Sequence, residues 1–380
     1  MPHRHTQVTH VDELLNFRMS DTRVLMVIPT LNLVGGAQDQ LKLLSDELTK
    51  VGFQHDVRGL DSLGAITPHR SGIFRFFIYV AGAALWYLKV AFVLAQWGRK
   101  YSIVHLHGLG FPLFVLGFVS SVSDLRLVVK IPRSGEGSYI QSLSSAGLRR
   151  IWFLLFCAKA CTFVALTKDA KLDLQNAGVD DARIVHIPNG VQVPQAPSNK
   201  NSGKNVRIVF AGRLIERKNL RDAILASHEL RSEGIDEFEI VIIGDGPDRL
   251  PLEKLAQELG LARNIRFLGE LSNTRVLAEF DDASIFVLPS RSEGMSNSLL
   301  QACARSCAPV ISDIPQHREL FEDGRSGMFF SSVEGLVDRL RFLIQSKQFE
   351  EVGRQARKVI YDRYNITAVA QRYLEIYGAN

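Results

Sequence analysis

Glu293 and Gln301 are spaced eight residues apart, across a polar loop and the start of a predicted helix. A buried strand at 283–288 ends before Pro289, so the loop follows the carboxyl end of that strand. Glu293 offers a carboxylate that accepts hydrogen bonds from polyol hydroxyls, and Gly294 lets a ligand approach the backbone closely. Gln301 lies about one turn into the helix, so both polar side chains are expected at the same mouth.

The start of this helix is a candidate anion site. Ser296, Asn297 and Ser298 offer N-cap oxygens, and the helix is expected to begin at about Ser298. The first N–H groups of a helix lack partners within it, and the helix dipole favours negative charge there. An ordinary capped turn would show the same local pattern, so other motifs are needed to distinguish an anion site from a simple turn.

Two cations follow a strand and a glycine earlier in the chain. The strand at 205–211 leads into Gly212, Arg213 and, five residues later, Lys218. The arginine fork and the lysine point charge together suit a diphosphate. With Glu293 and the helix N-terminus, these residues predict a cleft for an anion joined to a polyol, which is the chemistry of a nucleotide-sugar.

The first half of the chain has weaker signals of the same kind. Gly35 and Gly36 lie between a strand at 23–28 and a long helix, which is typical of phosphate approach, although a plain glycine turn fits equally. His107 ends the strand at 101–107, at the edge where sites form in α/β sheets. A structural imidazole is the alternative interpretation of His107.

The elements that carry these residues alternate between strand and helix along both halves of the 380-residue chain. This alternation predicts an α/β protein with two doubly wound, parallel-sheet, Rossmann-like domains that face each other across a cleft. The predicted organisation is a flexible tail at 1–20, a first domain at 21–191, a Pro-, Ser- and Asn-rich linker at 192–204, a second domain at 205–364, and a C-terminal helix at 365–380 that crosses back to the first domain.

Basic residues and apolar residues are concentrated in the first half. Between Ser62 and Ala160 there are eleven basic and two acidic residues, an excess that is larger than the chain's net charge of +5. The segment Ile73–Trp97 is almost continuously apolar and is interrupted by Arg75 and Lys89. It fits a helix packed inside the domain, a helix lying in a membrane surface, or a transmembrane helix.

The four cysteines are spaced in two pairs of i and i+4 (Cys157 and Cys161, Cys303 and Cys307) without a metal-ligand pattern. Residues 1–20 have no apolar signal-peptide core. We therefore expect a reduced, cytoplasmic protein with buried thiols and no metal site.

Taken together, the motifs resemble those of the group 1 glycosyltransferases, the retaining, GT-B-fold enzymes of glycosyltransferase family 4. The resemblance covers residues 23 to about 378. The matching motifs are Gly35-Gly36, His107-Gly108, Pro188-Asn-Gly-Val191, Phe210-Ala-Gly-Arg213 with Lys218-Asn219, Ile243-Gly-Asp-Gly-Pro247, Phe267-Leu-Gly269, and Leu288-Pro-Ser with Glu293-Gly-Met-Ser-Asn297.

The resemblance implies that the second domain holds the donor, a nucleoside-diphosphate sugar, and that the first holds the acceptor. Arg213 and Lys218 would hold the diphosphate, Glu293 the sugar hydroxyls, and the backbone near Leu268 the base. The other donor contacts would come from Gly35, Gly36, Gly212, Gly294, Gln301 and the amides of Met295, Ser296, Asn297 and Ser298. His107 would lie near the anomeric centre, and Arg133 and Asn189 are candidates on the acceptor side.

Two departures and one absence qualify the resemblance. Gln301 stands where the family has a second glutamate that holds the ribose, so donor binding is expected to be altered. The family's usual glycine is replaced around Ser306-Cys307. No DxD motif is evident, so the two cations and helix termini would carry the diphosphate charge without a metal. Retention would follow from front-face substitution, in which a phosphate oxygen takes the acceptor proton.

Three functions remain open. The first is a membrane-surface glycosyltransferase that builds a polysaccharide or a lipid-linked glycan, with contact to anionic lipid at the inner face of the cytoplasmic membrane. A polyprenyl-linked or glycolipid acceptor fits the basic, aromatic-rich first domain. The second is a soluble transferase to a small acceptor or a sugar-nucleotide epimerase. The third is a donor-binding pseudoenzyme, suggested by Gln301. Nucleic acid is not expected as a partner.

Overall fold

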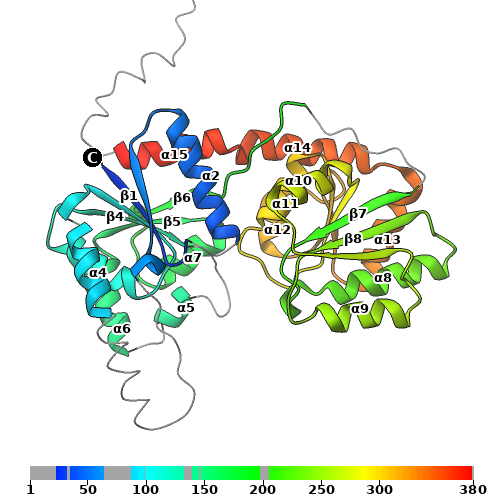
Figure 1. Ribbon diagram of the computed structural model, residues 1–380, viewed down its shortest axis with the longest axis horizontal. Helices are drawn as coiled ribbons and strands as arrows, with labels where there is room; N and C mark the ends of the chain where they lie inside the picture. Colours follow the sequence, from blue (N-terminus) through cyan, green and yellow to red (C-terminus); the bar gives the residue numbers. More distant parts are fainter. Residues whose placement is uncertain are drawn as a thin grey trace, which may run out of the picture.

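The chain folds into two α/β lobes that lie side by side (Figure 1). The computed structural model describes residues 23–31, 35–63, 87–97, 99–131, 139–144, 147–196 and 205–378. Each lobe is built on one parallel sheet, and the described residues give six strands to each. This architecture confirms the predicted pair of doubly wound domains.

The first lobe has the strand order β2-β1-β3-β4-β5-β6. The chain runs outward from β1 in both directions, so the sheet has a switch point between β1 and β3. The strands are β1 (Val24–Ile28), β2 (His55–Gly59), β3 (Ile103–His107), β4 (Arg126–Ile131), β5 (Cys161–Ala165) and β6 (Ile184–His186). The helices of this lobe include α2 (Gly36–Lys50), α4 (Phe111–Ser121), α5 (Tyr139–Ser144), α6 (Gly147–Trp152) and α7 (Lys168–Asn176).

The second lobe has the order β12-β11-β10-β7-β8-β9, with its switch point between β7 and β10. Its strands are β7 (Val206–Ala211), β8 (Phe238–Ile243), β9 (Ile265–Gly269), β10 (Ile285–Leu288), β11 (Ala308–Ser312) and β12 (Met328–Phe330). Its helices are α8 (Leu220–Ser232), α9 (Arg249–Glu258), α10 (Asn273–Asp282), α11 (Asn297–Ala304), α12 (Pro315–Leu320), α13 (Val333–Ser346) and α14 (Phe349–Tyr364).

The last helix, α15 (Ile366–Gly378), packs on the first lobe, whereas α14 packs on the second (Figure 1). The passage between them is pinned at Val191, whose N–H donates to the Tyr364 carbonyl and whose carbonyl accepts from the Ile366 N–H. Two segments that connect the lobes are thus bonded to each other. This pairing fixes the point at which the chain passes from one lobe to the other.

Tyr373 and Tyr377 of α15 are almost completely buried in the core of the first lobe, with β1 and β3 residues such as Met26 and Ile103. The Tyr377 hydroxyl lies 2.6 Å from Nδ1 of His105. The C-terminal helix therefore covers one face of the first sheet.

Three short elements have no clear signal in the sequence. The apolar stretch at 148–159 forms α6 followed by a π-helical turn, Phe153–Cys157, which directs Phe153 and Cys157 into the core against α4. The polar segment around Glu319 contains α12, which begins at Pro315, a proline at the first helical position. Strand β12 has only three residues, too few for a period of two to be recognised.

Most of the apolar segment Ile73–Trp97 lies outside the described residues. Residues 87–97 are helical, with Val90 and Leu94 buried while Leu88 and Phe92 are exposed. No helix in the described part of the chain is long and apolar enough to cross a membrane. The four cysteines all lie in the described part of the chain, where they are buried and form no disulfide.

Candidate active site

The helix that follows β10 joins the two lobes through its first turn. Ser296 is the N-cap of α11, and its Oγ accepts the Leu299 N–H at 3.4 Å. Asn297 Nδ2 donates to the Gly36 carbonyl at 2.8 Å, and Asn297 Oδ1 accepts from Asn189 Nδ2 at 2.9 Å. Residues that were selected from both halves of the sequence are thus in direct contact. The Asn189 N–H also points to the Met295 sulfur, at 3.1 Å.

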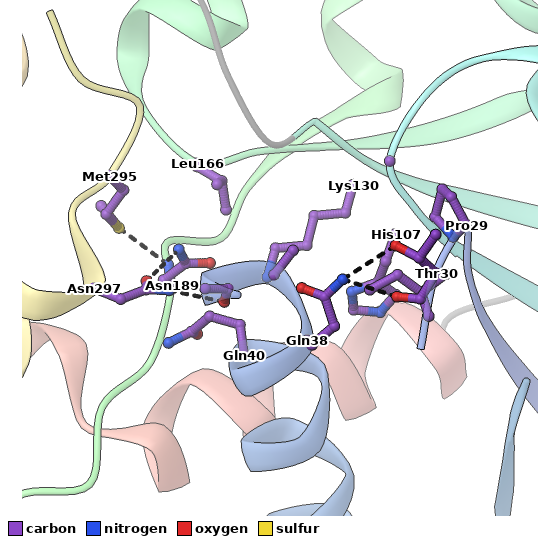
Figure 2. Close-up of a pocket in the computed structure, with 14 residues that line it drawn as sticks. Pro29, Thr30, Gln38, Gln40, His107, Lys130, Leu166, Asn189, Met295 and Asn297 are labelled. Carbon is purple, nitrogen blue, oxygen red and sulfur yellow. Dashed lines mark hydrogen bonds between the residues drawn. The ribbon is translucent and has the colours of Figure 1, made fainter. Parts of the chain in front are cut away.

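A cavity of about 360 Å³ lies at this junction, at the switch point of the first sheet (Figure 2). Five of the predicted site residues line it: Gly36, His107, Asn189, Met295 and Asn297. The other lining residues are Ile28, Pro29, Thr30, Ala37, Gln38, Gln40, Gly108, Lys130 and Leu166. The cavity is therefore formed mainly by the first lobe and closed by the first turn of α11 from the second.

His107 and its neighbour His105 are buried beside this cavity. Their rings are 4.0 Å apart between centroids. Burial, together with the nearby His105 and Lys130, holds the pKa of His107 well below its usual range. The imidazole is therefore neutral at physiological pH. Its Nε2 is buried and has no hydrogen-bond partner among the described residues.

The sequence motifs of the second lobe form a separate charged cluster. Lys218 Nζ lies 2.6 Å from Oε1 of Glu293, and Arg217 Nη1 lies 3.5 Å from Oε2. Burial would raise the pKa of the Glu293 carboxyl, but Lys218 and then Arg217 outweigh burial and lower that pKa. Glu293 and Lys218 are both buried, so this is a desolvated ion pair.

Both oxygens of Glu293 therefore lie beside cations. The contact of Glu293 with sugar hydroxyls stays a prediction. Arg217 was not selected from the sequence, yet it binds the loop: its Nη1 donates to the Ser292 carbonyl at 2.6 Å, and its own carbonyl accepts the Arg291 N–H. Arg213 is exposed, and no ion pair or side-chain hydrogen bond of Arg213 is found within the described ranges.

Glycines allow the turns at the carboxyl edge of the second sheet to come into backbone contact. A Cβ at Gly244 would lie 2.0 Å from the Gly212 carbonyl oxygen, and one at Gly246 would lie 2.1 Å from that of Leu214. The Gly244 N–H also donates to the Gly269 carbonyl at 2.7 Å. The turns after β7, β8 and β9 therefore pack backbone to backbone, which requires residues without side chains.

The remaining predicted residues that the structure describes do not line the cavity. Leu268, near the end of β9, is half-buried against the core, and Gln301 is in the second turn of α11. Gly35 precedes α2 and is not among the cavity-lining residues. Gly212, Gly294 and Ser298 do not line the cavity either. Arg133 lies outside the described residues.

Sequence reasoning missed Lys130, Gln38 and Gln40 as lining residues. Gln40 Nε2 donates to the Gly190 carbonyl at 2.9 Å, and Gln38 Nε2 donates to the Thr30 carbonyl at 2.8 Å. Both side chains come from the first five residues of α2, so the position just after Gly35-Gly36 was the available signal. Lys130 is the next-to-last residue of β4 and had been counted only as a basic residue. Across the described ranges, no three His, Cys, Asp or Glu side chains are placed to hold a metal ion.

Replacing Gln301 with glutamate should leave the fold intact and keep or improve donor affinity. Gln301 Nε2 lies 3.4 Å from Asn273 Oδ1, a weak contact that a rotated Asn273 amide can replace by donating to the new carboxylate. A carboxylate accepts hydrogen bonds from a vicinal diol more strongly than an amide does. Calorimetric titration with nucleotide-sugars would measure the change. A large loss of affinity in Gln301→Glu, with unaltered thermal unfolding, would show that the amide itself is required.

Two Rossmann-like lobes, with a cavity between them and a cationic cluster at the carboxyl edge of the second sheet, define the architecture of a two-domain, GT-B-type transferase. The family model described as Glycosyltransferase Family 4 matches residues 34–194, and the one described as Glycosyl transferases group 1 matches residues 194–359. The chain belongs to the group 1 glycosyltransferases of glycosyltransferase family 4.

Individual relatives agree with this assignment. GDP-mannose:cellobiosyl-diphosphopolyprenol alpha-mannosyltransferase from Xanthomonas oryzae pv. oryzae is 24% identical over 287 residues, 73% of this chain and 74% of that protein. UDP-Gal:alpha-D-GlcNAc-diphosphoundecaprenol alpha-1,3-galactosyltransferase from Escherichia coli is 25% identical, over 73% of this chain and 76% of its own. The crystal structure of Anabaena HepE in complex with UDP superposes with a TM-score of 0.71 at 15% identity, covering 94% of this chain and 100% of that one. This structural match confirms the GT-B fold.

Proposed function

We propose that this glycosyltransferase moves a hexose from a nucleoside-diphosphate sugar to a saccharide carried on a polyprenyl diphosphate, with retention and without a metal ion. The observation that carries the proposal is the cation cluster at the switch point of the second sheet. Arg213, Arg217 and Lys218 follow β7 directly, and the first turn of α11 follows the neighbouring strand β10. Ligands of doubly wound sheets bind beyond such a switch point.

The chemistry of the cluster fits a departing diphosphate. Lys218 has three N–H donors and gives one to Glu293, so two remain for phosphate oxygens. Arg213 is exposed and offers a planar fork. Fixed positive charge that already stands where negative charge develops lowers the barrier without reorganisation. Two side-chain cations and a helix N-terminus can therefore replace a divalent ion.

The choice of acceptor and the retention rest on the family and its relatives. The two relatives described above are named for diphosphopolyprenol-linked acceptors and for alpha linkages. Neutral His107, at the end of β3, would face the anomeric centre from the first lobe, with Asn189 beside the acceptor. Biosynthesis of a polysaccharide or glycolipid at the inner face of the cytoplasmic membrane would use such an enzyme.

A screen of nucleotide-sugars by thermal shift, followed by transfer assays with the best donor in EDTA, tests this function. We expect one donor to stabilise the protein and to be transferred to a sugar-diphosphate lipid, with the anomeric configuration of the donor kept in the product by NMR. Tight donor binding without transfer to any acceptor would support a pseudoenzyme. Transfer to small free sugars alone would support a soluble enzyme.

An apolar and basic face on the first lobe suits contact with anionic lipid. Four side chains of α6 and the following turn are exposed by 41 to 85%: Leu148, Ile151, Trp152 and Leu155. Arg149 and Arg150, also exposed, lie among them. The turn packs against α4, whose Phe118 is 42% exposed and contacts Trp152 of α6. Exposed apolar side chains with arginines among them are typical of interfacial binding.

Substituting Leu148 and Leu155 together with glutamate should reduce sedimentation with phosphatidylglycerol vesicles by about tenfold or more, because two exposed leucines that would insert into the lipid are lost and two negative charges are added. Leu250→Glu is the matched control, since Leu250 on α9 is 75% exposed on the other lobe. High salt should weaken binding of the wild type. Equal vesicle binding by the double variant and the control would contradict a role of this face in lipid binding.

A further inference from the structure

Lys130 is a buried cation in the wall of the cavity between the lobes. It is the fifth residue of β4 and pairs in register with His107 of β3. Residues alternate between the two faces of a strand, so Lys130, His107 and His105 share one face of the sheet. The tyrosines of α15 cover the same face: Lys130 Nζ lies 5.9 Å from the centre of the Tyr373 ring.

The described surroundings of Lys130 contain polar and aromatic groups but no negative charge. The side chain is only 7% exposed, and no carboxylate within the described ranges lies within 4.0 Å of its Nζ. Its near neighbours His105 and His107 are neutral. Burial lowers the pKa of Lys130 to about 8, so the amine still carries its charge at pH 7.

A buried charge without a counter-ion is strongly unfavourable, and it is usually retained where it meets an opposite charge. The Gln40 and Asn189 amides line the same space (Figure 2), and each keeps one N–H after its bond to the Gly190 carbonyl or to Asn297 Oδ1. An amide N–H and an ammonium group can together bind an oxyanion. The missing counter-ion is therefore expected to arrive with the ligand.

We infer that Lys130 binds a phosphoryl group of the acceptor, which makes the cavity beside β3 and β4 an acceptor-phosphate subsite. The inference rests on the proposed function, in which the acceptor saccharide is carried on a diphosphate. The donor diphosphate has its own cations, Arg213 and Lys218, and neither of them lines this cavity. Lys130 lies on the first lobe, near the end of β4. It can therefore bind the acceptor, which is the second anionic substrate of the proposed reaction.

The test compares wild-type protein with Lys130→Met and Lys130→Arg, using two acceptor analogues that share one sugar. The first analogue carries the sugar on a short-chain alkyl diphosphate, and the second is the uncharged alkyl glycoside. Calorimetry measures binding of each analogue and of the nucleoside diphosphate, so the result does not depend on turnover. Lys171→Met, on α7 of the same lobe and outside the cavity lining, is the matched control.

We expect Lys130→Met to weaken binding of the alkyl diphosphate at least tenfold, with little change for the glycoside or the nucleoside diphosphate. Lys130→Arg should retain most of the affinity, because the charge is kept. An equal loss for both analogues, or a loss confined to the nucleoside diphosphate, would overturn the inference, as would no change at all. Absence of transfer with any acceptor would refute the proposed function but leave these binding results decisive for Lys130.

A second measurement covers the case in which Lys130→Met does not fold. Lysines of the wild-type protein are labelled by reductive ¹³C-methylation, and the Lys130 resonance is assigned from Lys130→Arg. The sugar alkyl diphosphate should raise the pKa of Lys130, because a bound anion favours the charged amine. The nucleoside diphosphate alone should not. If the pKa of Lys130 does not change at a saturating concentration of the sugar alkyl diphosphate, the result contradicts the phosphate subsite.

Discussion

Lys218→Met is expected to lower the rate of sugar transfer by about 100- to 1000-fold, the usual effect of removing one group that stabilises developing negative charge. The same substitution should also destabilise the second lobe. It leaves the Glu293 carboxylate buried, with Arg217 3.5 Å away as the remaining cation of the ion-pair cluster. Breaking one side of a buried ion pair costs about 3–5 kcal/mol.

The two effects can be separated by a double variant. Lys218→Met with Glu293→Gln removes both charges, so most of the stability measured by urea unfolding should return while transfer stays low. Lys254→Met is the matched surface control, because Lys254 pairs with Glu258 at 3.6 Å with side chains 76% and 60% exposed. It should alter neither property measurably. A double variant that regains normal transfer would show that Lys218 serves only to neutralise Glu293.

Gly244→Ala is expected to destabilise the protein by more than about 3 kcal/mol and to abolish donor binding. The new Cβ would lie 2.0 Å from the Gly212 carbonyl oxygen, and the backbone there has a φ of +124°. Gly212 cannot move away easily, since its N–H donates to the Ile243 carbonyl at 3.0 Å. The turns after β7 and β8 would have to separate, and they carry the residues placed around the diphosphate.

Gly234→Ala provides the comparison for Gly244→Ala. Gly234 has a φ of +80°, but a Cβ there would meet nothing within 4 Å. Only the left-handed backbone penalty remains, about 1–2 kcal/mol. Urea unfolding and nucleotide titration of both variants measure the difference. Similar losses of stability in the two variants would mean that backbone conformation, rather than contact between the two turns, determines the effect.

The architecture was readable from the sequence because each buried strand is a short apolar run that ends at Gly, Pro or a polar cluster. Phe238–Ile243 is such a run, and it coincides with β8. Elements without a periodic signal were missed. The π-helical turn at Phe153–Cys157 depends on how its side chains pack against α4, and three-residue β12 depends on pairing with β11.

The site was only partly readable, because its decisive contacts join residues far apart in the chain. Lys218 and Glu293 were both selected, but nothing local to either shows that they form a buried pair 75 positions apart. Asn297 was selected as a cap, yet its side chain binds Gly36, 261 positions away. From the sequence, Lys130 is only a polar residue near the end of a strand. Its buried position depends on packing against the neighbouring strand and α15.

The most direct test of the account is a structure of the protein with its bound nucleoside diphosphate, prepared in EDTA. We predict that the phosphorus atoms lie within about 5 Å of the Arg213 guanidinium and of Lys218 Nζ, at the N-terminus of α11, and that no metal ion bridges the phosphates. Arg213 and Lys218 directed away from the phosphates, or a nucleotide that binds only when a divalent ion is restored, would contradict the account.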